Sequence, residues 1–187
     1  MPEKKTGPKA EKTLVRKYIF EGRSLKLRVD TVLTAEGRRS TREIVEKPDF
    51  VAVVAVDADD NVLLVNQFRT ALGKNLLEIP AGGIEKGEDV ATTVIREMQE
   101  ETGLKPGKLV RLSGFYLSPG FSNEYLHLYL AMDLTPAPLR AEDTAGIELE
   151  RVPVAQIPEL ITSGRIQDSK SIAGLLYYLE YRKKNSE

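Results

Sequence analysis

Three glutamates, Glu97, Glu100 and Glu101, stand close together in a segment expected to be helical. Positions three and four apart lie on one face of an α-helix, so the three carboxylates form one cluster. Adjacent carboxylates repel one another unless a cation joins them, and only Arg96 and Lys105 are close in sequence. The arrangement suits a hard divalent cation such as Mg²⁺, which takes oxygen ligands. Taken alone, the same spacing is also typical of a solvated acidic face.

The helix expected to carry this cluster runs from about residue 89 to residue 102. Asp89 suits the N-cap, and Gly103 suits the left-handed residue that ends a helix. An apolar stripe beside the glutamates can face a core, so the carboxylates are expected at the edge of the buried face. The stripe consists of Val90, Ala91, Val94, Ile95 and Met98. Gly82 and Gly83 precede the helix and predict a turn.

The full spacing resembles the signature of the Nudix hydrolases. It runs from Gly82 through Glu88 to residues 96–104, which read REMQEETGL. The resemblance implies hydrolysis of a phosphoanhydride in a nucleoside diphosphate linked to another group, with Mg²⁺ or Mn²⁺ as the cofactor. It implies that Arg96 orients the carboxylates and that Glu88 supports the junction between loop and helix. The implied metal ligands are Glu97, Glu100, Glu101 and the main-chain carbonyl of Ala81.

Motifs outside the signature resemble the ADP-ribose pyrophosphatase group. Residues 77–82 read LEIPAG, residues 67–69 read QFR, and residues 118–124 read SPGFSNE. The resemblance then covers about residues 40–181 and implies cleavage of ADP-ribose to AMP and ribose 5-phosphate. Another nucleotide sugar, such as GDP-mannose, is the alternative substrate. A non-catalytic module that binds ADP-ribose is a second alternative, but the intact acidic cluster counts against it.

The resemblance also assigns roles in substrate binding. Arg69 would meet the diphosphate, and Glu85 would lie near the metals or the terminal ribose. Ser118 and Glu124 would contact the substrate around the terminal ribose. Glu43 would meet the adenine from the other subunit of a homodimer. Read without the signature, Arg69 is a salt bridge at a strand end, Ser118 part of a turn and Glu43 an exposed strand residue.

The general base stays open between several carboxylates. Several relatives place a glutamate in the loop before the last strand, where this chain has Glu142 and Asp143. A glutamate of the helix is the other candidate. A carboxylate with a pKa near 4 is a weak base unless burial raises that pKa. Thr41 stands where some relatives have an arginine near the adenine, which leaves base recognition open.

The order of expected elements predicts an α/β (α+β) fold. Helices are expected at residues 89–102, 153–163 and 169–182. Strands are expected at residues 14–20, 24–33, 40–47, 50–56, 62–67, 76–79, 109–117, 125–133 and 147–152. The resemblance implies the Nudix arrangement, a mixed β-sheet sandwiched between helices, here with a small N-terminal antiparallel β-sheet. We expect a loose tail at residues 1–12, an N-terminal β segment for dimerisation at 13–48 and a catalytic domain at 49–187.

The composition excludes several classes of function. The chain has no cysteine, which excludes thiol nucleophiles and thiolate metal sites. Its one histidine, His127, lies in an alternating strand pattern and is interpreted as structural. The net charge of −1, from 27 basic and 28 acidic residues, gives no electrostatic case for a nucleic-acid partner. With no membrane-length apolar run and no signal-peptide pattern, we expect no membrane association and a cytoplasmic location.

Overall fold

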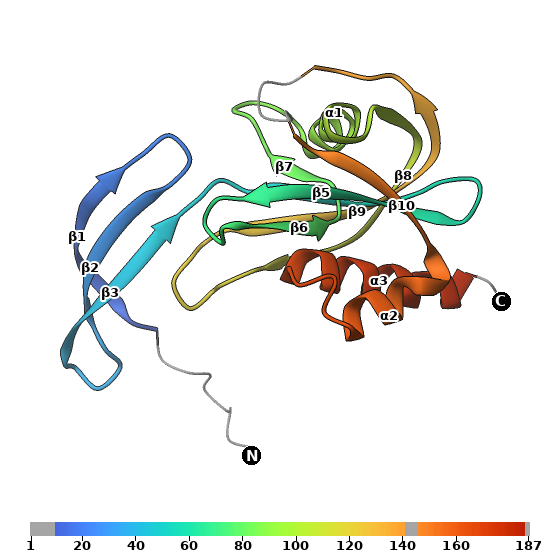
Figure 1. Ribbon diagram of the computed structural model, residues 1–187. Coiled ribbons are helices and arrows are strands. Elements are labelled where there is room, and N and C mark those ends of the chain that lie inside the picture. Colours follow the sequence, from blue (N-terminus) through green and yellow to red (C-terminus); the bar gives the residue numbers. More distant parts are fainter. Residues whose placement is uncertain (1–9, 141–145, 186–187) are drawn as a thin grey trace, which may run out of the picture. The chain divides into compact units, whose positions relative to one another are not determined.

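The computed structural model describes residues 10–140 and 146–185 of the chain (Figure 1). The chain divides into two compact units. The first unit comprises Met1–Pro48 together with Ser118–Glu124, and the second comprises Asp49–Leu117 and Tyr125–Glu187. The expected loop at residues 118–124 therefore associates with the N-terminal strands rather than with the strands that flank it in sequence.

The first unit is a three-stranded antiparallel sheet. Its strands are β1 (Lys12–Glu21), β2 (Lys26–Leu33) and β3 (Arg39–Glu46), with β2 in the centre. The loop joins this sheet through the end of β3. The N–H of Val45 donates to the carbonyl of Phe121 at 2.8 Å. The side chain of Asn123 exchanges two hydrogen bonds with the backbone of Lys47. The small N-terminal antiparallel sheet expected from the sequence is confirmed.

The second unit is built on a mixed sheet of seven strands. They are β4 (Phe50–Val56), β5 (Asn61–Arg69), β6 (Lys74–Glu78), β7 (Ala81–Gly83), β8 (Leu104–Tyr116), β9 (Tyr125–Pro136) and β10 (Glu148–Pro153). The order is β10-β5-β4-β9-β8, with β6 beside β5 and β7 beside β4. Strands β4 and β9 run parallel, and the other pairs are antiparallel.

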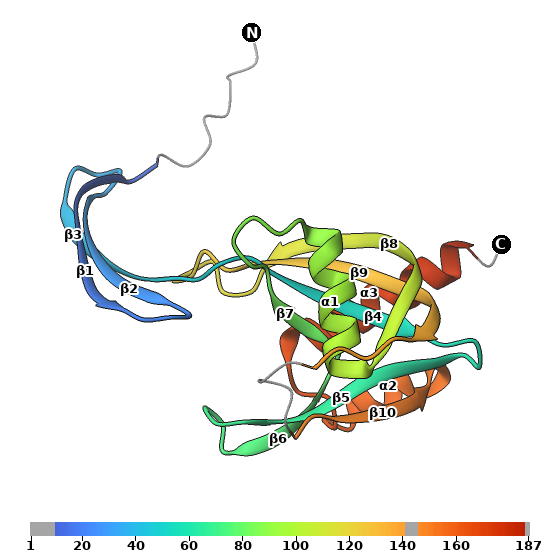
Figure 2. The same ribbon diagram turned by 90° about the horizontal axis from the view of Figure 1, so that it is seen from above.

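Helices cover both faces of this sheet. Helix α1 (Val90–Thr102) lies on one face, and α2 (Ile157–Thr162) and α3 (Ser169–Asn185) lie on the other (Figures 1 and 2). The sandwich expected from the sequence is confirmed. Within the described ranges, no helix has both the length and the apolar character needed to cross a bilayer.

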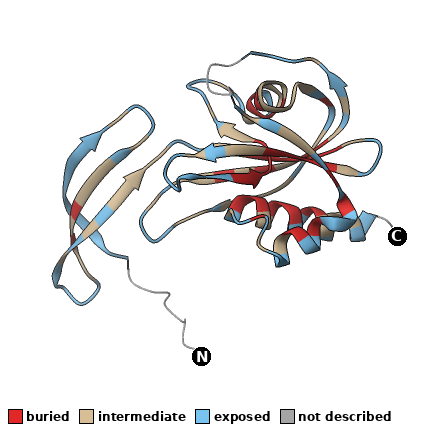
Figure 3. Cartoon of the chain, viewed as in Figure 1, coloured by how far each residue is buried: buried red, intermediate tan, exposed pale blue. Residues whose placement is uncertain are grey.

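Strand β4 separates two hydrophobic cores. Its continuous run of small and β-branched residues is buried on both faces, as the sequence predicts (Figure 3). Val51 and Val53 pack toward α1 with Val94 and Met98. Residues of the opposite parity pack in the larger core with α2 and α3. Because side chains alternate along a strand, one strand anchors helices on both sides.

Three elements differ from the expected ones. Residues 81–83 form strand β7 instead of a free turn, because Ala81–Gly83 pairs with β4. Strand β8 begins at Leu104 and includes Pro106, which an edge strand tolerates. The helix expected at residues 153–163 is divided into the 3-10 turn η2 (Val154–Gln156) and α2.

Glu142 and Asp143, the loop candidates for the general base, lie outside the described residues.

Candidate active site

Helix α1 has both caps that the sequence predicts. The side chain of Asp89 accepts hydrogen bonds from the N–H groups of Ala91 and Thr92, at 3.0 and 3.1 Å. At the other end, Gly103 has a φ of 73° and donates to the carbonyl of Gln99. Side chains do not adopt this left-handed conformation without strain, so glycine is needed there. The helix ends at Thr102, which places the acidic cluster in its last two turns.

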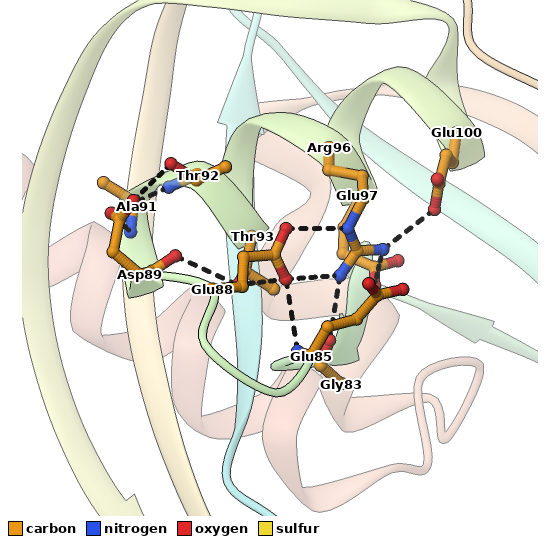
Figure 4. A network of polar contacts seen from close by, with 10 residues as sticks. All are labelled: Gly83, Glu85, Glu88, Asp89, Ala91, Thr92, Thr93, Arg96, Glu97 and Glu100. Atoms are coloured by element: carbon orange, nitrogen blue, oxygen red, sulfur yellow. Dashed lines mark hydrogen bonds and ion pairs between the residues drawn. The ribbon is translucent and has the colours of Figure 1, made fainter.

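Arg96 joins the carboxylates of this helix and the loop before it (Figure 4). Its Nε donates to Glu88 at 2.9 Å, and its Nη2 donates to the same carboxylate at 3.0 Å and to the carbonyl of Gly83 at 2.9 Å. Its Nη1 donates to Glu97 at 2.6 Å and to Glu100 at 3.0 Å. One guanidinium therefore offsets the repulsion among three partly buried carboxylates and orients them.

Gly82 lies directly against the carboxylate of Glu97. A Cβ added at residue 82 would overlap the Glu97 carboxyl group, whereas a Cβ added at Gly83 would meet nothing within 4 Å. Both residues belong to β7, which pairs with β4. The first glycine of the signature is therefore required for close approach of the helix carboxylate to the strand, not for a positive φ.

Glu101 is the most perturbed carboxylate of the cluster. Its Oε2 accepts a 2.9 Å hydrogen bond from the N–H of Ala81. Burial raises the pKa of Glu101 to about 7, because the Ala81 hydrogen bond offsets only part of the burial and Glu97 adds a like charge. Burial also raises the pKa of Glu97, although Arg96 opposes that shift. Buried Glu97 and half-buried Glu101 are thus two carboxylates whose charged forms are disfavoured.

Arg69 ends strand β5 beside a buried acid that the sequence reading missed. Its Nε and Nη2 donate to the two oxygens of Glu78 at 2.9 and 2.5 Å. Lys170 of α3 pairs with Glu78 from the other side and with Asp168 at 3.2 Å. The salt bridge considered for Arg69 is present. The sequence signal was a glutamate between the apolar residues of a buried strand, because charges in such places are almost always paired.

The remaining predicted residues lie in less enclosed places. Glu85 is exposed, and its N–H donates to Glu88. Glu43 is exposed on β3. The carbonyl of Ser118 accepts from two N–H groups of its own turn. Glu124 forms an ion pair with Lys47. Of these four residues, Glu85 belongs to the same unit as helix α1, and Glu43, Ser118 and Glu124 belong to the first unit.

The family model for the NUDIX domain matches residues 47–175 of the chain. The chain belongs to the Nudix family. This confirms the resemblance indicated by residues 82–104.

Among proteins similar to this Nudix chain are two from Bacillus. It is 39% identical over 173 residues to a methanol dehydrogenase activator of Bacillus methanolicus, covering 89% of this chain and 91% of the relative. It is 37% identical over 169 residues to an ADP-ribose pyrophosphatase of Bacillus subtilis (strain 168), with the same coverages. A crystal structure of an ADP compounds hydrolase superposes with a TM-score of 0.89 at 20% identity, covering 96% of this chain and 98% of that one. That likeness shows the shared fold.

Nudix hydrolases generally use a divalent cation, and the donors here suit one. Glu97, Glu100, Glu101 and the carbonyl of Ala81 are oxygen donors, and burial raises the pKa values of Glu97 and Glu101. Yet no three acidic or histidine side chains converge on one point within residues 10–140 and 146–185. Glu97 and Glu100 instead face Arg96. Each of these carboxylates uses one oxygen for that guanidinium, Oε1 of Glu97 and Oε2 of Glu100, so Arg96 and an ion can be bound by different oxygens.

Proposed function

We propose that this Nudix chain hydrolyses the pyrophosphate bond of ADP-ribose and releases AMP and ribose 5-phosphate. The observation that carries the proposal is the intact set of Arg96, Glu97, Glu100 and Glu101 at the edge of a buried helix face, beside Ala81. The similarity to an ADP-ribose pyrophosphatase over most of both chains supports the substrate. A module that only bound ADP-ribose would have no use for buried carboxylates that destabilise one another.

Mg²⁺ is the proposed cofactor, with Mn²⁺ as the alternative ion. Glu97, Glu100, Glu101 and the Ala81 carbonyl would hold it. When bound, the cation supplies charge neutralisation for the diphosphate and lowers the pKa of a coordinated water. Arg96 contributes by orienting Glu97 and Glu100, which it contacts directly.

The general base is proposed among three carboxylates: Glu101, Glu142 and Asp143. Glu101 is supported by its place in the acidic cluster of α1, where its Oε2 accepts a hydrogen bond from the N–H of Ala81. The other two are supported by the family resemblance. A pH–rate profile of the wild type and of each Gln or Asn variant separates them, because the acidic limb moves only when the base is replaced.

For substrate binding we propose Arg69 at the diphosphate and Glu85, Ser118 and Glu124 around the terminal ribose. Arg69 is supported by its geometry. The guanidinium uses Nε and Nη2 for Glu78, and its Nη1 has no hydrogen bond to a group in the described part of the chain. Its side chain is 38% exposed, so the third nitrogen is available to a phosphate oxygen. For the proposed role, Glu124 has to release its ion pair with Lys47 and accept a hydrogen bond from a ribose hydroxyl.

A homodimer is proposed in which residues 13–48 form the interface and Glu43 contacts the adenine of the partner's site. Every residue of edge strand β1 is exposed. Its large apolar side chains are 39–58% exposed, namely Leu14, Val15, Tyr18, Ile19 and Phe20. Exposed apolar side chains on an unpaired edge favour association with another sheet or surface. A second copy of the chain is the occupant that also explains Glu43.

The proposed activity is tested with a panel of nucleotide sugars in Mg²⁺, measuring phosphate after a coupled phosphatase. ADP-ribose resists the phosphatase, whereas AMP and ribose 5-phosphate release phosphate. We expect the highest kcat/KM for ADP-ribose, and release slower by about 10² or more for Glu101→Gln. A kcat/KM at least tenfold higher for GDP-mannose, which also resists the phosphatase, would contradict the substrate. Binding of ADP-ribose without phosphate release would favour the non-catalytic module.

Activation of a methanol dehydrogenase is a second candidate function, favoured by the 39% identity to such an activator. It is tested by adding the purified chain to methanol dehydrogenase of Bacillus methanolicus and following methanol oxidation. Stimulation by the wild type but not by Glu101→Gln would tie the activation to hydrolysis. Equal stimulation by both would point to a binding role, and no stimulation would remove this candidate.

A further inference from the structure

Behind Arg69 lies a line of alternating charges that runs into the protein interior. Glu78 is 2% exposed, and Lys170 is 8% exposed. The carboxylate of Glu78 accepts from Arg69 through both oxygens, and its Oε2 also accepts from the ammonium of Lys170. The three side chains come from β5, from β6 and from the first turn of α3. Buried charges are costly, so such a set is expected to have a use beyond packing.

The inner end of this line is fixed by the start of α3. The carboxylate of Asp168 accepts from the N–H of Lys170 at 3.0 Å and from the ammonium of the same residue at 3.2 Å. It also accepts from the hydroxyl of Ser171, whose Oγ takes the buried N–H of Ile79 at 2.8 Å. The ammonium of Lys170 is therefore held on two carboxylates and cannot easily leave Glu78.

Lys170 helps to keep Glu78 ionised and paired with Arg69. Burial alone would raise the pKa of Glu78, but the hydrogen bond from Arg69 and the charge of Lys170 outweigh it and hold that pKa below its usual value. Glu78 thus stays ionised and keeps both oxygens as acceptors. Side-on pairing fixes the plane of the Arg69 guanidinium, which otherwise sits on a long flexible side chain. The free Nη1 edge then has one orientation.

We propose that Glu78 and Lys170 are positioning residues that hold Arg69 in the orientation that binds the diphosphate of the substrate. This inference rests on the proposed hydrolysis of ADP-ribose. Neither residue touches the substrate in the proposal, because both are buried behind Arg69. They order the Arg69 side chain before the substrate binds, so less conformational entropy is lost on binding. They also fix the direction in which its Nη1 points.

Two variants test the proposal. Glu78→Gln removes the charge that holds Arg69, and Lys170→Met removes the inner cation at nearly constant length. The controls are Glu180→Gln and Lys183→Met, which remove an exposed ion pair from the same helix α3. ADP-ribose affinity is measured by calorimetry in EDTA, where no turnover occurs, and KM and kcat are measured in Mg²⁺.

The proposal expects Kd and KM to rise at least tenfold in both test variants, with kcat changed far less, and no change in the controls. When a contact stabilises the bound substrate and the transition state equally, its loss raises KM and leaves kcat nearly unchanged. In an Arg69→Ala background the further loss from Glu78→Gln or Lys170→Met should vanish, because both act through Arg69.

A purely structural role gives a different result. Lower thermal stability with an unchanged Kd would overturn the proposal, as would an equal further loss of affinity in the Arg69→Ala background. Should Glu78→Gln not fold, Glu78→Asp keeps the charge, withdraws it from Arg69, and is judged by the same criteria. A wild type that binds ADP-ribose without cleaving it overturns the proposed hydrolysis alone. A wild type that does not bind ADP-ribose overturns both.

Discussion

The N–H of Ala81 donates a 2.9 Å hydrogen bond to Oε2 of Glu101. This contact joins strand β7 to the last turn of helix α1, so the proposed carbonyl ligand and the proposed carboxylate ligand belong to one hydrogen-bonded pair. It also means that Glu101 cannot move without freeing a main-chain donor. The chemistry of the site therefore depends on both the helix and the short glycine-containing strand beside it.

Replacing Glu101 by Gln keeps the size of the side chain and removes its charge. We expect kcat for ADP-ribose to fall by about 10² or more, because charge stabilisation at a bound metal contributes several kcal/mol. Glu97→Gln should behave alike, and chelation with EDTA should abolish activity of the wild type. The measurement is AMP release at saturating substrate, with Glu180→Gln as the exposed control. Near-normal turnover by both active-site variants would end the assignment of the metal ligands.

Gly82→Ala places a methyl group where the Glu97 carboxylate lies, whereas Gly83→Ala places one in open space. We expect the first variant to lose activity by about 10² or more, because a ligand displaced by about 1 Å no longer reaches the same ion. The second should lose much less. Circular dichroism and melting curves show whether both variants fold. Equal losses in the two variants would mean that the close approach of Glu97 to the strand is unimportant.

The pair formed by Glu88 and Arg96 should appear in the pH dependence of stability. The hydrogen bond from Arg96 lowers the pKa of Glu88 to about 2, from an ordinary value of 4.5, and the Thr93 hydroxyl adds to the shift. A lowered carboxyl pKa contributes stability above pH 4.5 that is lost as the pH falls toward 2. Glu88→Gln should therefore cost about 1.5–3 kcal/mol at neutral pH. The difference from wild type should shrink below pH 4.5.

Urea unfolding of wild type and Glu88→Gln, at neutral pH and at two acidic values, measures this difference. The matched control is Glu85→Gln, an exposed glutamate in the same loop. A difference between wild type and Glu88→Gln that does not depend on pH would show that the stabilisation has another origin.

Ser171→Ala tests the connection between α3 and the strand that leads to Ala81. The Ser171 hydroxyl is the acceptor for the N–H of Ile79, and both residues are fully buried. Removing it leaves that donor without a partner, which costs about 1–3 kcal/mol. The exposed Ser24→Ala should be neutral within experimental error. The measurement is the urea concentration at the midpoint of unfolding. An unchanged midpoint for Ser171→Ala would mean that another group takes over the hydrogen bond.

Local signals predicted the helix and its ends well. Asp89 and Gly103 cap α1 at the residues expected, because capping depends on a few neighbouring backbone groups. The buried strand β4 was equally predictable, because its sequence is a continuous apolar run. Strand β7 was not, because two of its three residues are glycines with low strand propensity and only pairing with β4 makes them a strand.

The site was predictable only where its residues are local in sequence. The cluster around Arg96 follows from helical spacing within one segment. Glu78 and Lys170 are 92 residues apart, and no periodicity links them. The sequence also suggested an ion shared by the helix glutamates, but it could not show that Arg96 contacts two of them through one nitrogen.

The proposed dimer should be detectable in solution and necessary for activity. Light scattering should give about twice the chain mass of 20.8 kDa. Ile19→Glu places a charge on edge strand β1, where the apolar side chain is 53% exposed, and should dissociate the dimer and abolish activity. Lys17→Glu on the same strand is the control for charge alone. A monomeric wild type with full activity would rule out the shared site.

Mixing two inactive variants decides whether Glu43 acts across the interface. Glu43→Ala lacks the proposed adenine contact, and Glu101→Gln lacks a proposed metal ligand, so each homodimer should have little or no activity. In a mixed dimer, the chain with intact Glu101 receives Glu43 from its partner, which restores one complete site. We expect activity to return after the two variants are co-refolded, and not when they are only combined without subunit exchange. If Glu43 serves the site of its own chain, every site in the mixed dimer keeps one defect and no activity returns.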